Sequence, residues 1–149
     1  VAVVVFGENP YAETAGDRPD LSFPSDDLAL IRRLRAQGIS VVSVFLSGRP
    51  LYMTREINAS NAFVAAWLPG SEGGGIADML LRKPDGTVAY DYRGLLSFSW
   101  PGAPVRSDGD APLFPLGYGL DYAQPKDIGQ LPEVLEATAN STAIRAAPH

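Results

Sequence analysis

The chain has 149 residues, of which 46% are hydrophobic, and its formal net charge at pH 7 is -5. This hydrophobic fraction supports a single packed domain and excludes a chain that is disordered throughout. The negative charge argues against a nucleic-acid partner held through phosphates, and the lack of cysteine excludes disulfides and a cysteine nucleophile. No apolar run approaches the roughly 20 residues of a membrane span. We expect no metal and no cofactor, because neither a metal-ligand spacing nor a cofactor motif is found.

Three apolar runs predict strands, at Val1–Phe6, Ile39–Leu46 and Ala62–Leu68. The first is an unbroken β-branched run, typical of a strand buried on both faces. It begins without Met, capping polar residues or a signal peptide, so the chain is expected to be a piece of a longer polypeptide.

Helical patterns separate these runs. Ser25 is a good N-cap residue for a helix that Gly38 closes, and Leu51–Ile57 predicts a helical turn or two. A third helix is predicted over Ile76–Leu81. Strands that alternate with helices indicate an α/β fold with a largely parallel sheet.

The second half of the chain is rich in loops. Pro84-Asp85-Gly86 predicts a tight turn, Thr87–Tyr92 a small hairpin arm and Leu95–Trp100 a fourth strand. From residue 121 onward a linker is predicted, with a short helix over Pro132–Thr138 and a frayed end.

Ligands of parallel sheets bind where the strands end, and three loops of this chain begin there. Among their side chains are four acids and an arginine that we single out: Glu8, Glu13, Asp17, Arg49 and Glu72. We expect these residues to lie near one another. Acids with a single arginine suit a polyhydroxylated ligand, or one half of an acid/base pair.

Each side chain also has a purely structural interpretation. Arg49 is expected to tie loops together by pairing with Asp17 or Glu13, and Glu8 to cap a helix or a backbone turn. Tyr11 is either a platform for a sugar ring or a loop anchor. Trp67 and Trp100 are expected in the core, and His149, the only histidine, is no catalytic candidate, so no Ser-His-Asp triad is available.

The stretch Gly70-Ser71-Glu72-Gly73-Gly74-Gly75 lies between the third strand and the third helix. Glycines let the backbone turn sharply, so Glu72 is a candidate for catalysis, while a helix N-terminus also suits an anion. A nucleotide site is disfavoured because the loop lacks the Lys-Ser/Thr pair of a phosphate loop.

Five segments in order resemble glycoside hydrolase family 3, most of all its exo-acting β-glucosidases and β-glucan exohydrolases. They are Val3–Asp17 (VVVFGENPYAETAGD), Leu46–Pro50 (LSGRP), Ala65–Asp78 (AAWLPGSEGGGIAD), Leu95–Pro101 (LLSFSWP) and Pro112–Tyr122 (PLFPLGYGLDY). Arg82–Arg93 is longer than the corresponding turn of the family, so an added loop or hairpin is expected there.

The resemblance implies that residues 1–122 form the second, C-terminal domain of such an enzyme, a three-layer α/β sandwich, followed over 123–149 by a linker or the start of a further domain. It implies a retaining mechanism in which Glu72 is the general acid/base and an Asp of a separate (β/α)8-like barrel domain is the nucleophile. It also implies a β-glucan or gluco-oligosaccharide substrate and a periplasmic or secreted location. The remaining site candidates, expected to bind substrate or support loops, are Arg49, Glu13, Asp17, Tyr11 and Ser71.

Two other classes remain open. A non-catalytic module would bind sugar or a partner protein through the same edge of the sheet. A flavodoxin-like ligand-binding domain would bind flavin or nucleotide there.

Overall fold

The computed structural model describes residues 1–24, 26–105, 107 and 109–134. Its sheet consists of three parallel strands, β1 (Ala2–Gly7), β2 (Val41–Leu46) and β3 (Ala62–Trp67), in the order β1-β2-β3. The three predicted strands are therefore confirmed: β1 is shifted by one residue from its apolar run, and β2 and β3 are two residues and one residue shorter than theirs.

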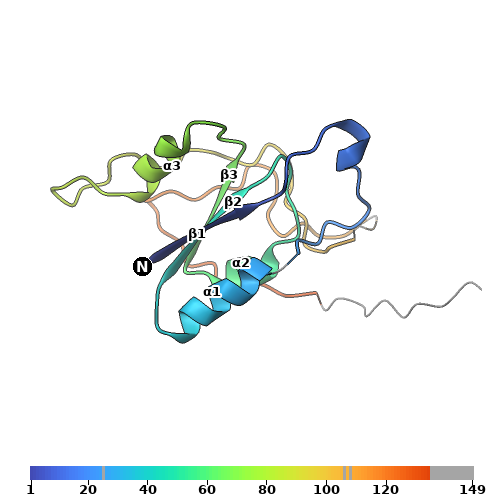
Figure 1. Ribbon diagram of the computed structural model, residues 1–149, viewed down its shortest axis with the longest axis horizontal. Coiled ribbons are helices and arrows are strands. Elements are labelled where there is room, and N and C mark those ends of the chain that lie inside the picture. The colour runs from blue at the N-terminus through green and yellow to red at the C-terminus, as the bar shows by residue number, and fades with distance from the viewer. Residues whose placement is uncertain (25, 106, 108, 135–149) are drawn as a thin grey trace, which may run out of the picture.

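Helices lie on both sides of the sheet. Figure 1 shows α1 (Asp26–Ala36) and α2 (Thr54–Ala59) on one side and α3 (Gly73–Leu80) on the other. The prediction of an α/β fold with a parallel sheet between helices is confirmed. A short 3-10 turn, η1 (Glu13–Gly16), interrupts the loop between β1 and α1.

The ends of α1 follow the predicted capping chemistry. Asp26 and Asp27 lie in its first turn and Arg33 and Arg35 in its last, the signs that the helix dipole favours. Gly38 takes a φ of 75°, which a residue without Cβ adopts at low cost, and so ends the helix as predicted. The predicted cap, Ser25, lies outside the described residues.

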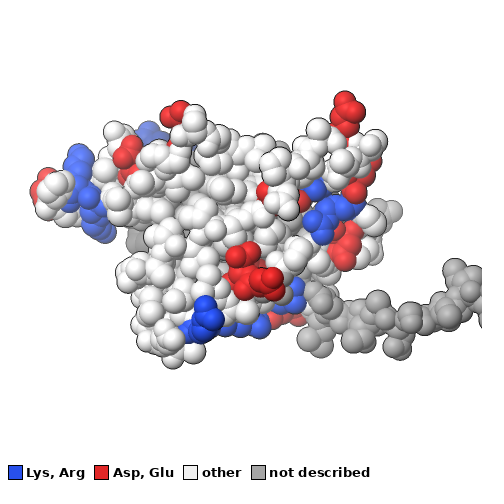
Figure 2. All heavy atoms as spheres, viewed as in Figure 1, with Lys and Arg blue, Asp and Glu red and all other residues white. Residues whose placement is uncertain are grey.

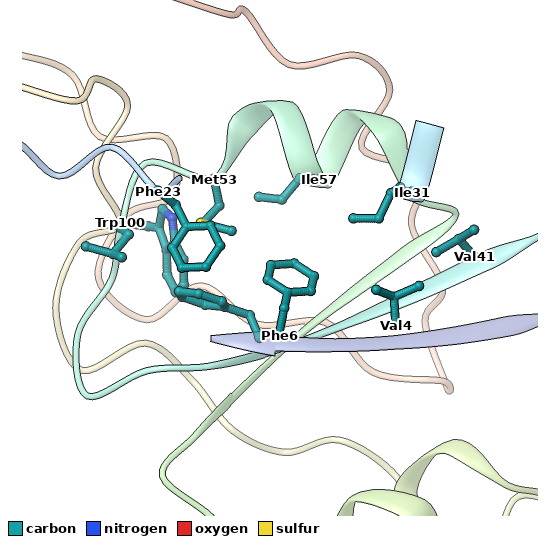
Figure 3. Packing of buried hydrophobic residues seen from close by; sticks show 10 residues of the cluster. Val4, Phe6, Phe23, Ile31, Val41, Met53, Ile57 and Trp100 are labelled. Carbon is teal, nitrogen blue, oxygen red and sulfur yellow. The ribbon is translucent and has the colours of Figure 1, made fainter. Parts of the chain in front are cut away.

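The core lies between the sheet and the α1–α2 layer. Phe6 of β1, Phe45 of β2 and Phe23 of the first loop form its aromatic centre, with ring centroids 5.4–5.8 Å apart. Figure 3 shows Ile31 of α1 and Ile57 of α2 pointing toward this face of the sheet.

The other face of β1 is open. Val3 and Val5 are 53% and 58% exposed, whereas Val44, the neighbour of Val5 on β2, is fully buried. The expectation that this first strand is buried on both faces is thus wrong. The reason is that β1 forms the edge of the sheet, while α3 lies over β3, where Ile76 and Met79 face Val64 across a recess. In Figure 2 most of the visible face is without charged side chains, apart from a compact acidic patch near its middle and charges toward its ends.

The predicted fourth strand, Leu95–Trp100, does not form. Only an isolated antiparallel bridge joins Trp100 to Phe114, and Leu96 exchanges backbone hydrogen bonds with Gly117 and Tyr118. An irregular partner segment rich in Pro and Gly prevents a regular ladder.

The turn at Pro84-Asp85-Gly86 is confirmed by the hydrogen bond from Gly86 N–H to the Lys83 carbonyl, 2.8 Å. The hairpin arm predicted next to it is reduced to one antiparallel bridge, between Arg82 and Val88.

The described segment that follows residue 126 packs along α2. Asn58 accepts a hydrogen bond from Leu131 N–H, 2.9 Å, and donates one to the Leu131 carbonyl, 3.0 Å. The Tyr52 hydroxyl accepts from Val134 N–H at 2.8 Å. This part of the predicted linker therefore belongs to the folded unit. Of the predicted helix over 132–138, residues 132–134 are not helical and the rest lies outside the described residues.

Candidate active site

The three loops that begin at the carboxyl edge of the sheet start side by side. Glu8 N–H donates to the Leu46 carbonyl at 3.0 Å, and Ser47 N–H donates to the Trp67 carbonyl at 3.1 Å. A Cβ at Gly7 would overlap the Leu46 carbonyl oxygen, so only glycine allows the first two loops to approach this closely. The edge predicted to bind a ligand is thus a continuous backbone platform.

Glu8 is the charged centre of this platform. Its carboxylate accepts from Arg49 Nη2 at 2.8 Å and Nε at 3.1 Å, and from Ser47 Oγ at 2.5 Å, while Arg18 Nη1 lies 3.6 Å away. The side chains of Glu8 and Arg49 are 9% and 23% exposed. Burial acts to raise the pKa of Glu8, but the hydrogen bonds from Arg49 and Ser47 and the positive charges of Arg49 and Arg18 outweigh it and lower this pKa.

Arg49, in the loop after β2, is bonded to the loop after β1 at two places, Glu8 and Gly16. One guanidinium nitrogen donates to the Gly16 carbonyl, and the guanidinium carbon lies 4.3 Å from the ring centroid of Tyr11. The hydrogen bonds to Glu8, followed by its charge, raise the pKa of Arg49. Its partner is thus Glu8 rather than the predicted Asp17 or Glu13, and the ring of Tyr11 lies against the guanidinium.

The two other candidate acids of the first loop lie outside this ion pair. Glu13 is the first residue of η1 and Asp17 follows its last, both with exposed side chains, and the Asp17 charge acts on Arg49 without a direct hydrogen bond among those described. No described contact joins either residue to Glu72. In Figure 1 the blue turn that contains η1 and helix α3 lie on opposite sides of the strand ends.

Two residues with a left-handed backbone conformation closely precede Glu72 in the chain. Trp67 at the end of β3 has a φ of 55° and Gly70 a φ of 57°, and Glu72 N–H then donates to the Pro69 carbonyl at 3.0 Å. Helix α3 begins at Gly73, three residues before its predicted start, so that Glu72 occupies the N-cap position. Its side chain makes no capping hydrogen bond. It is exposed and accepts a hydrogen bond from Ser71 Oγ, 3.0 Å.

An open recess of about 230 Å³ lies beside Glu72, between β3 and α3. Its walls are apolar apart from Glu72 itself and Tyr92, whose ring lies 5.4 Å from that of Tyr122. Burial, followed by the neighbouring Tyr122, raises the pKa of Tyr92 to about 12, so its phenol is neutral at ordinary pH.

Sequence reasoning missed three members of this edge: Ser47, Arg18 and Tyr92. Ser47 is 2% exposed and directly follows β2, and that position next to the predicted site could have identified it. Arg18 lies in a polar loop without periodicity, so no signal marked it. Tyr92 lies in the stretch for which an added loop or hairpin was predicted, and no side chain in that stretch was predicted to reach the site.

The part of the chain described by the structure contains no cluster of three or more His, Cys, Asp or Glu side chains arranged to hold a metal ion. Within that part, no helix has the length and apolar character needed to cross a membrane. His149 lies outside the described residues.

The fold and the site define a parallel α/β domain whose loops at the carboxyl edge of the sheet carry the largely buried Glu8–Arg49 ion pair and the exposed carboxylate of Glu72. The profile of the glycosyl hydrolase family 3 C-terminal domain matches residues 1–122. The chain belongs to this family.

Two relatives and two solved structures show the range of similarity. The periplasmic beta-glucosidase of Salmonella typhimurium is 31% identical, with 82% of this chain and 19% of the relative covered. The lysosomal beta glucosidase of Dictyostelium discoideum is 37% identical, with 82% and 16% covered.

Among solved structures, an exo-1,3/1,4-beta-glucanase from a Pseudoalteromonas species is 50% identical with a TM-score of 0.81, over 90% of this chain and 18% of that one. A beta-glucosidase from Listeria innocua is 26% identical with a TM-score of 0.65, over 80% and 20%. The chain thus spans about a fifth of the length of the proteins it matches.

Proposed function

We propose that this chain supplies the general acid/base of a retaining, exo-acting β-glucosidase, which removes terminal β-D-glucosyl residues from β-glucans or gluco-oligosaccharides. The observation that carries the proposal is the placement of Glu72. It is an exposed carboxylate on the ligand edge of the sheet, in a chain 50% identical to an exo-1,3/1,4-beta-glucanase.

Retention requires two carboxyl groups about 5–5.5 Å apart on either side of the scissile bond. Glu72 donates its proton to the glycosidic oxygen as the bond to the leaving group breaks, and the partner carboxylate forms a covalent glycosyl-enzyme. Glu72 then takes a proton from the water that releases glucose. Ser71 Oγ, which donates to Glu72 Oε1 at 3.0 Å, orients the carboxylate.

The nucleophile in this proposal is an Asp of a (β/α)8-like barrel domain of the same polypeptide. An exposed Glu72 suits this arrangement, because a side chain that faces solvent in one domain is free to close a pocket against another. The whole enzyme is proposed to work in the periplasm or outside the cell, in line with the periplasmic and lysosomal names of two relatives.

We assign Arg49 and Tyr11 to loop support. The guanidinium of Arg49 is occupied by Glu8, the Gly16 carbonyl and the Tyr11 ring, which leaves little of it for a sugar hydroxyl. The exposed acids Glu13 and Asp17 are proposed as acceptors for sugar hydroxyls at the rim of the pocket.

The test compares Glu72→Gln with the native full-length polypeptide on an alkyl β-glucoside and on an activated dinitrophenyl β-glucoside. Loss of the acid should slow the alkyl glucoside by about 10²-fold or more, while formation of the glycosyl-enzyme from the activated substrate changes far less. Azide should restore turnover of the activated substrate, because an anionic nucleophile attacks the glycosyl-enzyme without a general base.

Equal losses on both substrates without azide rescue would refute the assignment and favour a non-catalytic sugar- or partner-binding module. Residues 1–149 alone should be inactive toward either glucoside, since one carboxyl group cannot complete a retaining cycle. Steady turnover by this chain alone, abolished by Glu72→Gln, would overturn the need for a barrel nucleophile.

A further inference from the structure

Trp67 is one of two described residues other than glycine with a positive φ, here 55°. The left-handed region is unfavourable for a bulky side chain, because Cβ approaches the backbone carbonyl. The strand register shifts at the same place. Phe45 pairs with Ala65, but the next residue of β2, Leu46, pairs with Trp67, which leaves Ala66 as an extra residue in β3.

A bulge of this kind bends a strand and changes the direction in which the following side chains point. In this chain the bend falls five residues before Glu72. Beyond it the chain passes through the left-handed Gly70 and enters α3 directly after Glu72. The backbone conformation of Trp67 therefore sets the direction in which the Glu72 loop leaves the sheet.

Contacts on two sides hold Trp67 in this conformation. Its carbonyl accepts the hydrogen bond from Ser47 N–H, 3.1 Å. Its ring meets the Phe98 ring edge-on at 5.5 Å and lies tilted against the Trp100 ring at 5.9 Å. Trp100 is only 3% exposed, so the ring cluster is fixed to the core.

Through Ser47, the contacts of Trp67 continue to the Glu8–Arg49 ion pair. Ser47 is 2% exposed, and its hydroxyl donates to the Glu8 carboxylate at 2.5 Å, which Arg49 holds in turn. A path of direct contacts thus leads from the Arg49–Glu8 pair through Ser47 to the strained residue at the root of the Glu72 loop. Strained backbone persists only where its surroundings over-determine it, and such places are concentrated at functional sites.

We propose that Trp67 is a positioning residue for Glu72: its left-handed backbone, clamped between Ser47 and the Phe98 and Trp100 rings, aims the carboxylate at the leaving group. This inference rests on the proposed acid/base role of Glu72. Loss of the clamp leaves the acid present but misdirected, and a displacement of about 1 Å can slow a reaction by about 10²-fold.

The experiment uses the full-length polypeptide with Trp67→Ala, which keeps the Cβ strain but removes the ring, and Trp67→Phe, which keeps an aromatic ring. The readout is kcat/KM on the alkyl and the dinitrophenyl β-glucoside. For Trp67→Ala we expect a loss of about 10-fold or more on the alkyl glucoside and of less than about 3-fold on the activated one. Trp67→Phe should restore the alkyl glucoside to within about 3-fold of the native rate.

Ile57→Ala is the matched control, because Ile57 is 8% exposed and belongs to the same hydrophobic core cluster, but lies on α2 rather than among the rings around Trp67. It should lower the melting temperature without separating the two substrates. If Trp67→Ala lowers both substrates equally, as the control would, the ring serves packing alone and the proposal is overturned.

Two further variants keep the test decisive. If Trp67→Ala does not fold, Phe98→Ala takes its place, because Phe98 is 42% exposed and its removal frees one side of the Trp67 ring. Selective loss on the alkyl glucoside supports positioning, and equal losses overturn it. Glu72→Gln separates the two hypotheses. If Glu72→Gln loses activity selectively on the alkyl glucoside and Trp67→Ala does not, only the positioning role of Trp67 is refuted. If Glu72→Gln shows no selective loss, both the acid/base role of Glu72 and the positioning role of Trp67 are refuted.

Discussion

Replacement of Arg49 by alanine removes the cation that holds the first two loops together. The change deletes the hydrogen bonds to Glu8 and to the Gly16 carbonyl and leaves a carboxylate that is 9% exposed with only Ser47 and the more distant Arg18. Charge-assisted hydrogen bonds contribute about 1.5–3 kcal/mol each, and breaking a fully buried ion pair costs about 3–5 kcal/mol. Because Arg49 is 23% exposed, we expect the free energy of unfolding to fall by about 2–4 kcal/mol at neutral pH.

The loss of stability in Arg49→Ala should depend on pH, and the titration of Glu8 determines the direction of that dependence. Although burial acts to raise its pKa, the contacts of Arg49, Ser47 and Arg18 bring the folded value below the ordinary 4.5. A lowered carboxyl pKa stabilises the fold above the unfolded pKa, and this stabilisation is lost as the pH falls through the folded pKa. The native chain and Arg49→Ala should therefore converge in stability as the pH falls from about 5 toward about 3.

Urea unfolding followed by tryptophan fluorescence measures both effects. With a slope of about 2 kcal/mol per molar urea, the midpoint should move by about 1–2 M at neutral pH. Arg33→Ala is the matched control, because Arg33 is an exposed arginine in the last turn of α1, and its loss should stay near about 0.5 kcal/mol. An Arg49→Ala loss no larger than this control, or one that is the same at both ends of the pH range, would refute the reasoning.

Three further predictions concern backbone approach, docking and burial. Gly7→Ala should lower the free energy of unfolding by about 1–3 kcal/mol, because its Cβ overlaps the Leu46 carbonyl oxygen, and an unchanged melting temperature would contradict this close approach. Asn58→Ala should speed amide hydrogen exchange at Leu131 by about 10-fold or more, because both hydrogen bonds to that residue are lost, and unchanged protection would show that the segment docks by other contacts. Burial raises the pKa of Glu56. The stability that its neutral form contributes is therefore present below the unfolded pKa and is lost as the pH rises through the folded pKa. Glu56→Gln should gain stability relative to the native chain from about pH 4 to about pH 7, and a stability difference that does not change with pH would exclude this cause.

The parts of the fold that follow from sequence are those in which local pattern and tertiary packing agree. The three apolar runs became β1 to β3, and the acids and arginines at the ends of α1 marked its direction. Leu95–Trp100 has the same apolar character, but its partner segment is broken by Pro and Gly, and a single strand cannot predict the regularity of its neighbour.

At the start of α3, by contrast, the sequence pattern predicted less regular structure than the chain forms. Three consecutive glycines disfavour a helix by about 1 kcal/mol each, so the pattern placed the start at Ile76. The turn from Pro69 to Glu72 already sets the helical direction, and the helix begins at Gly73. Local propensity is a weak guide where a preceding turn constrains the backbone.

At the candidate site, sequence order identified the loops but not the side chains that pair. The register of Gly7 with Leu46 places Glu8 beside Ser47, and Arg49 follows two residues later. That register is a property of the assembled sheet, so Asp17 and Glu13 were equally good partners on sequence alone. The roles of Glu72, Ser71, Glu13 and Asp17 toward a substrate remain predictions.

The segment that packs along α2 determines which contacts break first when the chain is pulled from its C-terminal side. A pull on the chain beyond residue 134 reaches the Val134–Tyr52 hydrogen bond first and the two Asn58–Leu131 bonds next, before it reaches the core. Tension applied there therefore acts on the attachment to Tyr52 and α2 before it acts on the sheet.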